Sequence, residues 1–372
     1  MALFDSKMTV GIAGAGSVAF ATAAWLEQAG HHAILWSPSG KRTRRLAAGE
    51  PLVARNAIEG SFRPGTAADA ADLAARADVV LIALPGYGHK AVLDALAPHL
   101  RNGQAVIFSS HASFGALYLG TKLAARGITL PIVAWGTTLA TARQADLTTV
   151  NVNTVRSKID LATIPEDRAE EGLRLCQALF GDRFVAREGL LSIALSNLNP
   201  QNHMGIALCN MTRMEHGETW GQGANITPNV GRLLERLDEE RLAIAEALGL
   251  QVRTIFDHFH LSYHVPRASI SEMNQEMHRQ GVGGTGPATA DSRYATEDVP
   301  YGLHVTAVLG DLVGRPAVLH RAGVQIFSAM YGRDFAAENT LLTDMGFDRL
   351  DLDQVKRACR TGILPAHDGA PA

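Results

Sequence analysis

Cysteine is scarce in this chain of 372 residues, and the few cysteines lie far apart. There are three, with no Cys-x-x-Cys pair: Cys176, Cys209 and Cys359. A secreted disulfide framework is built from an even set of cysteines, and structural zinc sites usually contain closely spaced pairs. The sequence therefore argues against both, and it favours a reducing cytoplasm as the location.

Charged residues and long apolar runs are also few. Only 19% of the residues are charged, the formal net charge is −3, and no Lys/Arg cluster is interleaved with aromatic residues, so we expect no nucleic-acid partner. The apolar run at 8–13 is short and is followed by glycines, so we expect neither a signal peptide nor a membrane span there. We expect small-molecule partners.

What the chain has in quantity is apolar residues, at 47%. Since single cores stop growing beyond about 250–300 residues, two domains are expected. Short apolar runs alternate with helical stretches in the first part of the chain, which predicts a parallel sheet covered by helices. The runs are Met8–Ala13, Ala33–Trp36, Val79–Leu84, Ala105–Phe108 and Ile132–Trp135.

The later part of the chain has helical periodicity, in Ser192–His216, Arg232–Leu248 and Val305–Met330. Between the two parts, Val150–Val155 resembles a strand and Glu166–Phe180 a helix. We therefore predict an α/β fold in which a Rossmann-type doubly wound sheet at 1–185 precedes a mainly helical domain at 186–364, with a frayed tail at 365–372.

A glycine-rich turn follows the first predicted strand. Gly14, Gly16, Ser17 and Ala19 lie in Gly-Ala-Gly-Ser-Val-Ala, which matches G-x-G-x-x-G/A at the start of a helix that we expect to end at Gly30. Gly14 allows the tight turn, Gly16 lets the backbone approach a pyrophosphate, and Ala19 lets helix and strand pack closely. This pattern predicts a dinucleotide site, although it also occurs in α/β turns that bind no nucleotide.

The end of the second predicted strand indicates which dinucleotide is bound. An NAD site usually has an acidic residue there, whereas this chain has Ser37 followed by Ser39, Lys41 and Arg42. Hydroxyl and cationic donors can bind the 2′-phosphate that a carboxylate would repel. The sequence favours NADP(H), and the open alternative for these residues is a solvated basic helix start.

Two more loops follow predicted strands and should line the nicotinamide end of the site. One contains Pro85, and the other is Ser109-Ser110-His111. His111 can equally be an ordinary loop histidine. The later glycine-rich stretch Gly281–Gly286 follows no predicted strand, so we expect a flexible loop rather than a phosphate site.

The helical domain contains a polar turn in front of an apolar helix. His203 lies in Asn199-Pro200-Gln201-Asn202-His203, where Asn199 is the expected N-cap and Pro200 the first helical residue. A carboxylate from Glu297 or Asp298, in the segment 293–302, could hold the imidazole in a useful protonation state. From the residues alone, a structural histidine and helix-terminal acids explain the same pattern.

These motifs together resemble the octopine/nopaline (opine) dehydrogenase family. The resemblance rests on the N-terminal glycine turn, N-P-x-x-H at 199–203 and R-Y-x-x-E-D-x-P-Y-G at 293–302, and it spans nearly the whole chain. It implies an NAD(P)-dependent condensation of an amine or amino acid with a 2-oxo acid or carbonyl, followed by reduction of the imine. It also implies that His203 is the general acid/base, Asp298 its partner and Arg293 the carboxylate clamp, with Tyr294 and Asn199 shaping the substrate pocket.

Three alternatives stay open at this point. An imine reductase would use the same chemistry after condensation. A ketopantoate-reductase-like hydroxy-acid dehydrogenase commonly uses a lysine of the helical domain, but residues 190–261 contain none. A non-catalytic NADP(H)-binding sensor would not need His203 and Asp298. The apolar helical domain is compatible with a homodimer.

Overall fold

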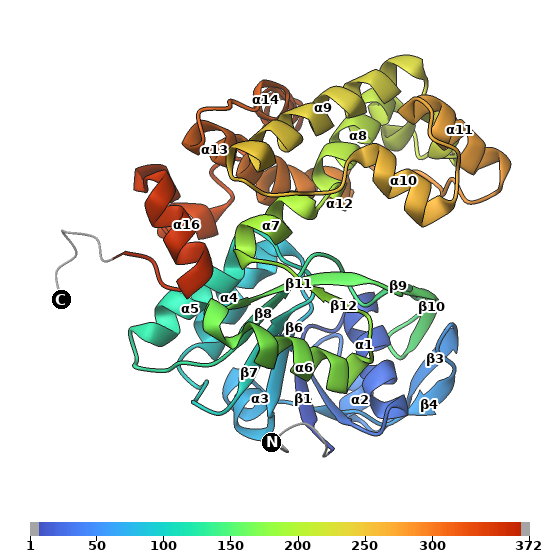
Figure 1. Ribbon diagram of the computed structural model, residues 1–372. Coiled ribbons are helices and arrows are strands. Elements are labelled where there is room, and N and C mark those ends of the chain that lie inside the picture. The colour runs from blue at the N-terminus through green and yellow to red at the C-terminus, as the bar shows by residue number, and fades with distance from the viewer. Residues whose placement is uncertain (1–6, 366–372) are drawn as a thin grey trace. The chain divides into compact units, whose positions relative to one another are not determined.

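The computed structural model describes residues 7–365 and divides the chain into two compact units (Figure 1). Unit 1 contains the residues up to Ala194 and those from Asp353 onward, and unit 2 is Leu195–Leu352. Most of the predicted tail, 366–372, lies outside the described residues. No helix within 7–365 is long and apolar enough to cross a membrane.

Unit 1 contains an eight-stranded sheet in the order β12-β11-β8-β7-β6-β1-β2-β5. The strands from β8 to β5 are parallel, β11 runs antiparallel to β8, and β12 is parallel to β11. All five predicted strands are present, which confirms the Rossmann-type prediction. The strands are β1 (Thr9–Ala13), β2 (His32–Trp36), β5 (Gly65–Thr66), β6 (Val79–Ile82), β7 (Ala105–Phe108), β8 (Ile132–Trp135), β11 (Ile159–Ile164) and β12 (Phe184–Ala186).

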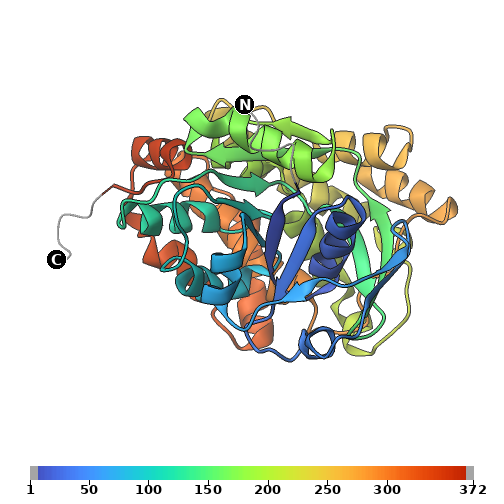
Figure 2. The same cartoon turned by 90° about the horizontal axis from the view of Figure 1, so that it is seen from below.

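A second sheet of four strands, in the order β4-β3-β10-β9, is part of the same unit. Its strands are β3 (Leu52–Asn56), β4 (Gly60–Phe62), β9 (Ala140–Gln144) and β10 (Thr149–Val155). Helix α1 (Ser17–Gln28) is buried along most of its length because it packs against strands of both sheets (Figure 2). It ends as predicted, with Gly30 at φ +87° just beyond it.

The other helices of unit 1 connect the strands or follow them. They are α2 (Arg44–Ala47), α3 (Ala70–Arg76), α4 (Gly86–Leu96), α5 (Gly115–Ala124), the short η1 (Glu166–Arg168), α6 (Ala169–Phe180), most of α7 (Gly189–Ser196) and α16 (Leu352–Thr361). The end of α16 packs closely on α5, because a Cβ at Gly120 would lie 2.4 Å from the carbonyl oxygen of Gly362. The contacts thus group α16 with the sheet domain, whereas the predicted helical domain extends to residue 364 and would include it.

Unit 2 is helical, and the order of sheet domain then helical domain agrees with the prediction. Its elements are α8 (Asn199–Glu215), η2 (Gly223–Asn225), α9 (Pro228–Ala247), α10 (Ile255–Tyr263), α11 (Ile270–Arg279), α12 (Arg293–Thr296), η3 (Val299–Leu303), α13 (His304–Leu312), α14 (Val318–Tyr331), α15 (Thr340–Asp344) and η4 (Phe347–Arg349). Two predicted helices are each split in two. The stretch Ser192–His216 is divided between α7 and α8, and Val305–Met330 is divided between α13 and α14, where Gly314 has φ +66°.

Candidate active site

The glycine turn after β1 has the geometry that a dinucleotide pyrophosphate requires. Gly14 has φ +138°, and a Cβ there would lie 2.2 Å from the carbonyl oxygen of Ala83. Gly16 is the N-cap of α1 and provides no side-chain cap, while a Cβ at Gly16 would meet no atom within 4 Å. The first N–H groups of α1 therefore border open space, and the residues present fit a bound phosphate.

The loop after β2 places its hydroxyls together. The side chain of Ser37 lies 3.4 Å from that of Ser39, and the Ser39 hydroxyl accepts from the backbone N–H of Lys41 at 3.4 Å. Ser37 is buried, whereas Ser39, Lys41 and Arg42 are exposed. No carboxylate takes part in these contacts.

Arg42 is connected to the glycine turn through Gln144, a residue that belongs to no sequence motif. Its guanidinium donates to the side chain of Gln144 on β9 at 3.0 Å. The backbone N–H of Gln144 donates to the Ser17 hydroxyl at 3.0 Å, and its side-chain amide donates to the carbonyl of Ala15 at 3.3 Å. The structure thus brings Arg42 and Ser17 to the start of α1, although no sequence pattern connects either with Gln144.

Two buried histidines lie beyond the carboxyl ends of β6 and β7. Pro85 is the N-cap of α4, which contains His89, and His111 follows β7. Burial lowers the pKa of His89 to about 4 and that of His111 to about 3. Both imidazoles are neutral near pH 7, so neither can supply an imidazolium there.

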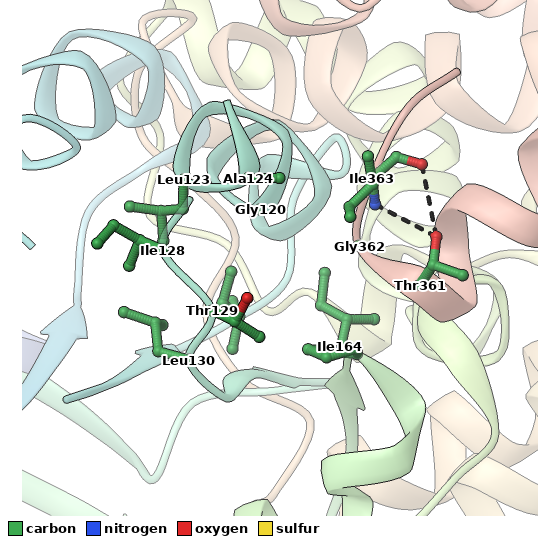
Figure 3. Close-up of a pocket in the computed structure, with 12 residues that line it drawn as sticks. Gly120, Leu123, Ala124, Ile128, Thr129, Leu130, Ile164, Thr361, Gly362 and Ile363 are labelled. Atoms are coloured by element: carbon green, nitrogen blue, oxygen red, sulfur yellow. Dashed lines mark hydrogen bonds between the residues drawn. The ribbon is translucent and has the colours of Figure 1, made fainter. Parts of the chain in front are cut away.

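A separate apolar cavity of about 260 Å³ lies at the opposite edge of the sheet (Figure 3). It is bordered by the start of β8, the end of the antiparallel strand β11, α5 and the segment after α16. None of its lining side chains is titratable; they include Leu123, Ile128, Leu130, Ile164 and Ile363. It does not belong to the polar sites described here.

In unit 2 the structure pairs the two residues for which an acid–base role is expected. Nδ1 of His203 on α8 lies 2.7 Å from Oδ2 of Asp298, which directly precedes η3. Their side chains are only 14% and 8% exposed. A buried carboxylate at this distance accepts a hydrogen bond from Nδ1–H and stabilises the charged imidazole.

Tyr294 covers the face of the same imidazole. The two rings are stacked with centroids 3.6 Å apart and planes inclined by 8°. The Tyr294 hydroxyl donates to the side-chain oxygen of Gln222 at 2.7 Å, and burial raises the pKa of Tyr294 to about 12. The tyrosine is therefore a neutral hydroxyl donor, and Gln222 is a second residue that the sequence did not indicate.

Arg293 and Asn199, the two other residues expected to bind substrate, are both exposed. The side chain of Arg293 is 59% exposed, and its Nε lies 3.9 Å from Oε2 of Glu297. Asn199 is the first residue of α8 and is exposed. The exposed side chain of Arg293 is accessible to a small carboxylate.

The predicted start of α8 was wrong by one residue. The N-cap is Leu198, not Asn199, and the backbone N–H of Asn199 donates to the side chain of Asn197 at 3.1 Å. Asn197 thus takes the role that Asn199 was expected to play. His203 lies at the start of the second helical turn instead of in the first.

A buried polar network supports this part of α8. The side chain of Gln201 donates to Asp238 at 2.8 Å, and the Arg241 guanidinium donates to the same carboxylate at 2.7 and 3.0 Å. The other Asp238 oxygen accepts from the backbone of Ile255 at 2.8 Å. All three polar side chains are at least 98% buried, so the network is a fixed support two residues from His203.

Known proteins share both units. Residues 186–331 match the family described as NAD/NADP octopine/nopaline dehydrogenase, alpha-helical domain, and residues 9–110 match NADP oxidoreductase coenzyme F420-dependent. The opine dehydrogenase of Arthrobacter sp. (strain 1C) is 30% identical over 363 residues, which are 96% of this chain and 99% of that protein. The chain belongs to the opine dehydrogenase family.

More distant members have the same fold. The protein ocs of Agrobacterium vitis is 26% identical over 92% of this chain and 95% of its own. A structure of octopine dehydrogenase with NADH and L-arginine has a TM-score of 0.79 at 16% identity and covers 98% of this chain and 100% of its own. Yersinopine dehydrogenase with NADP+ has a TM-score of 0.68 at 15% identity, covering 91% of this chain and 98% of its own. The protein is thus an oxidoreductase with a Rossmann fold.

Proposed function

We propose that this member of the opine dehydrogenase family condenses an amine or amino acid with a 2-oxo acid or carbonyl and reduces the resulting imine with NADPH to a secondary amine. The proposal rests on the 2.7 Å contact between Nδ1 of His203 and Oδ2 of Asp298 in the helical domain, where both side chains are almost buried. The sheet domain of the same chain has a glycine turn with free space at Gly16, where a dinucleotide can bind. A histidine with a charged partner can exchange a proton near neutral pH.

The reaction sets the task of these residues. Condensation forms a C=N bond and releases one water, and reduction adds a hydride to carbon, so one proton is consumed overall. When bound, the cofactor supplies the hydride. Asp298 holds Nδ1–H of His203, which leaves Nε2 to deliver the proton that the departing hydroxyl requires and to take it up in the reverse direction.

Arg293 is the proposed carboxylate clamp. Its planar guanidinium binds a carboxylate through two parallel hydrogen bonds, and it is exposed enough to receive one. Tyr294 stacks on His203, and the exposed Asn199 lies four residues before His203 on α8, so both are proposed to shape the substrate pocket. Structures of octopine dehydrogenase hold L-arginine, agmatine or pyruvate, so amines and 2-oxo acids are the substrates to test first.

The proposed preference for NADPH rests on the loop after β2. Ser37, Ser39 and Lys41 offer donors there, and Arg42 is held beside the start of α1 through Gln144. A carboxylate that would select the ribose 2′-hydroxyl of NAD is missing from this loop, at 37–45. Among the relatives, both NADH and NADP+ are found, so the choice depends on these residues.

The test is NADPH oxidation with pyruvate or glyoxylate alone and then with a panel of amino acids and amines, with NADH run in parallel. We expect turnover only when both partners are present, and faster turnover with NADPH. His203→Ala should abolish turnover and still bind NADPH. Turnover with the oxo acid alone would instead identify a hydroxy-acid dehydrogenase, and NADPH binding without any turnover would identify a sensor.

A further inference from the structure

The glycine-rich stretch of unit 2 is bonded to a second segment along its backbone. Gln222 N–H donates to Gly284 at 3.0 Å, Gly223 N–H donates to Gly283 at 3.0 Å, and Gly286 N–H donates to Trp220 at 3.0 Å. We call these two segments, 220–223 and 283–286, the glycine ribbon. The stretch predicted as a flexible loop thus takes part in a paired structure.

Close packing explains the glycines of the ribbon. A Cβ at Gly286 would lie 2.2 Å from the indole ring of Trp220, and a Cβ at Gly223 would lie 2.7 Å from the carbonyl oxygen of Asn274. The Trp220 indole N–H also donates to the carbonyl of Pro287 at 3.1 Å. The backbone on both sides of Gln222 is therefore held in place.

This anchored glutamine holds Tyr294, and Tyr294 lies against His203. Asp298 bonds to His203 in the plane of the imidazole, and a ring held by one hydrogen bond can still tilt about that bond. Tyr294 lies flat on the face of the ring, 3.6 Å away, and prevents the tilt. The hydrogen bond to Asp298 and the stacked ring of Tyr294 therefore restrain the imidazole in different directions, and together they fix where Nε2 points.

We propose that Gln222 and Tyr294 are positioning residues for His203, with the glycine ribbon as their anchor. The proposal rests on the proposed function and reassigns Tyr294, because its hydroxyl is bonded to Gln222 and one ring face is covered by His203.

The first test compares the unmodified full chain with three disrupting variants and one rescue variant. Gln222→Met removes the acceptor, Tyr294→Phe removes the donor but keeps the ring, and Tyr294→Leu removes the ring. We expect kcat to fall about five- to tenfold in the first two and further in the third, while the KM for NADPH stays within about twofold. Gln222→Glu keeps an acceptor oxygen and should restore most of kcat.

A measurement without substrate tests the positioning even if the proposed reaction fails. In 13C-histidine-labelled protein, the His203 ring protons should be shifted upfield by Tyr294, and His203→Gln identifies their signal. The shift should vanish in Tyr294→Leu and shrink in Gln222→Met. Tyr331→Phe, which loses a hydroxyl bond of 2.7 Å to Ala290 in the same unit, is the matched control and should keep it. An unchanged shift and unchanged kcat in Gln222→Met would overturn the proposal.

Discussion

Replacing Asp298 by asparagine removes the charge beside His203 with almost no change in size. The carboxylate is 8% exposed and lies 2.7 Å from Nδ1, so water cannot replace the lost interaction. A hydrogen bond to a charged group contributes about 1.5–3 kcal/mol. If this energy stabilises the imidazolium in the transition state, kcat should fall roughly 10- to 150-fold, at about 1.36 kcal/mol per tenfold.

The assay is steady-state kinetics of Asp298→Asn with saturating amine and oxo acid. The proposed dinucleotide site lies in unit 1, outside the unit that contains this substitution, so the KM for NADPH should stay within about twofold. Asp311→Asn is the control, because it removes a carboxylate that is 52% exposed and paired with Arg321 in the same unit. It should leave kcat unchanged. A fall of less than threefold in Asp298→Asn would refute the role given to this pair.

Three further predictions concern the cofactor, acid stability and packing. Arg42→Ala should raise the KM for NADPH about tenfold and leave that for NADH unchanged, with the exposed Arg44→Ala as control; equal effects on both cofactors would contradict the assignment. The pKa values of His89 and His111 fall from 6.5 to about 4 and 3 on folding, so unfolding takes up protons and Tm should fall as pH decreases below about 6.5. His111→Gln should flatten that Tm–pH curve, and an unchanged curve would show that His111 is not buried neutral. Gly302→Ala places a Cβ 2.2 Å from the Pro200 ring and should lower the free energy of unfolding in urea by about 1–3 kcal/mol, whereas a change below 0.5 kcal/mol would show that the ring can move.

The parallel sheet could be predicted because each of its central strands is a continuous apolar run between turn signals. Of the second sheet, the sequence predicts only β10, through the strand-like run Val150–Val155, and neither its partners nor their pairing. Strand β4 has only three residues, β3 is half exposed, and β10 pairs with β3 about a hundred residues away in the chain. Such short strands depend on a partner distant in sequence, and a single sequence does not show that partner.

In the candidate site, too, some residues could be predicted from the sequence and others could not. His203 and Asp298 are found through motifs, and their contact across 95 positions agrees with the expected pair. Gln144 and Gln222 belong to no motif, since each acts through one hydrogen bond to a residue far away in the chain. The N-cap of α8 was misassigned because Asn197 and Asn199 are both suitable caps, and only the backbone geometry distinguishes them.

The most direct test of the proposed reaction is the mass of the product formed from NADPH with a transferable deuterium, an amino acid and a 2-oxo acid. We expect a secondary amine that contains the carbon skeletons of both substrates, carries deuterium on the former oxo carbon, and has formed with the loss of one water from the two substrates. A deuterated 2-hydroxy acid, with the amino acid unchanged, would contradict it.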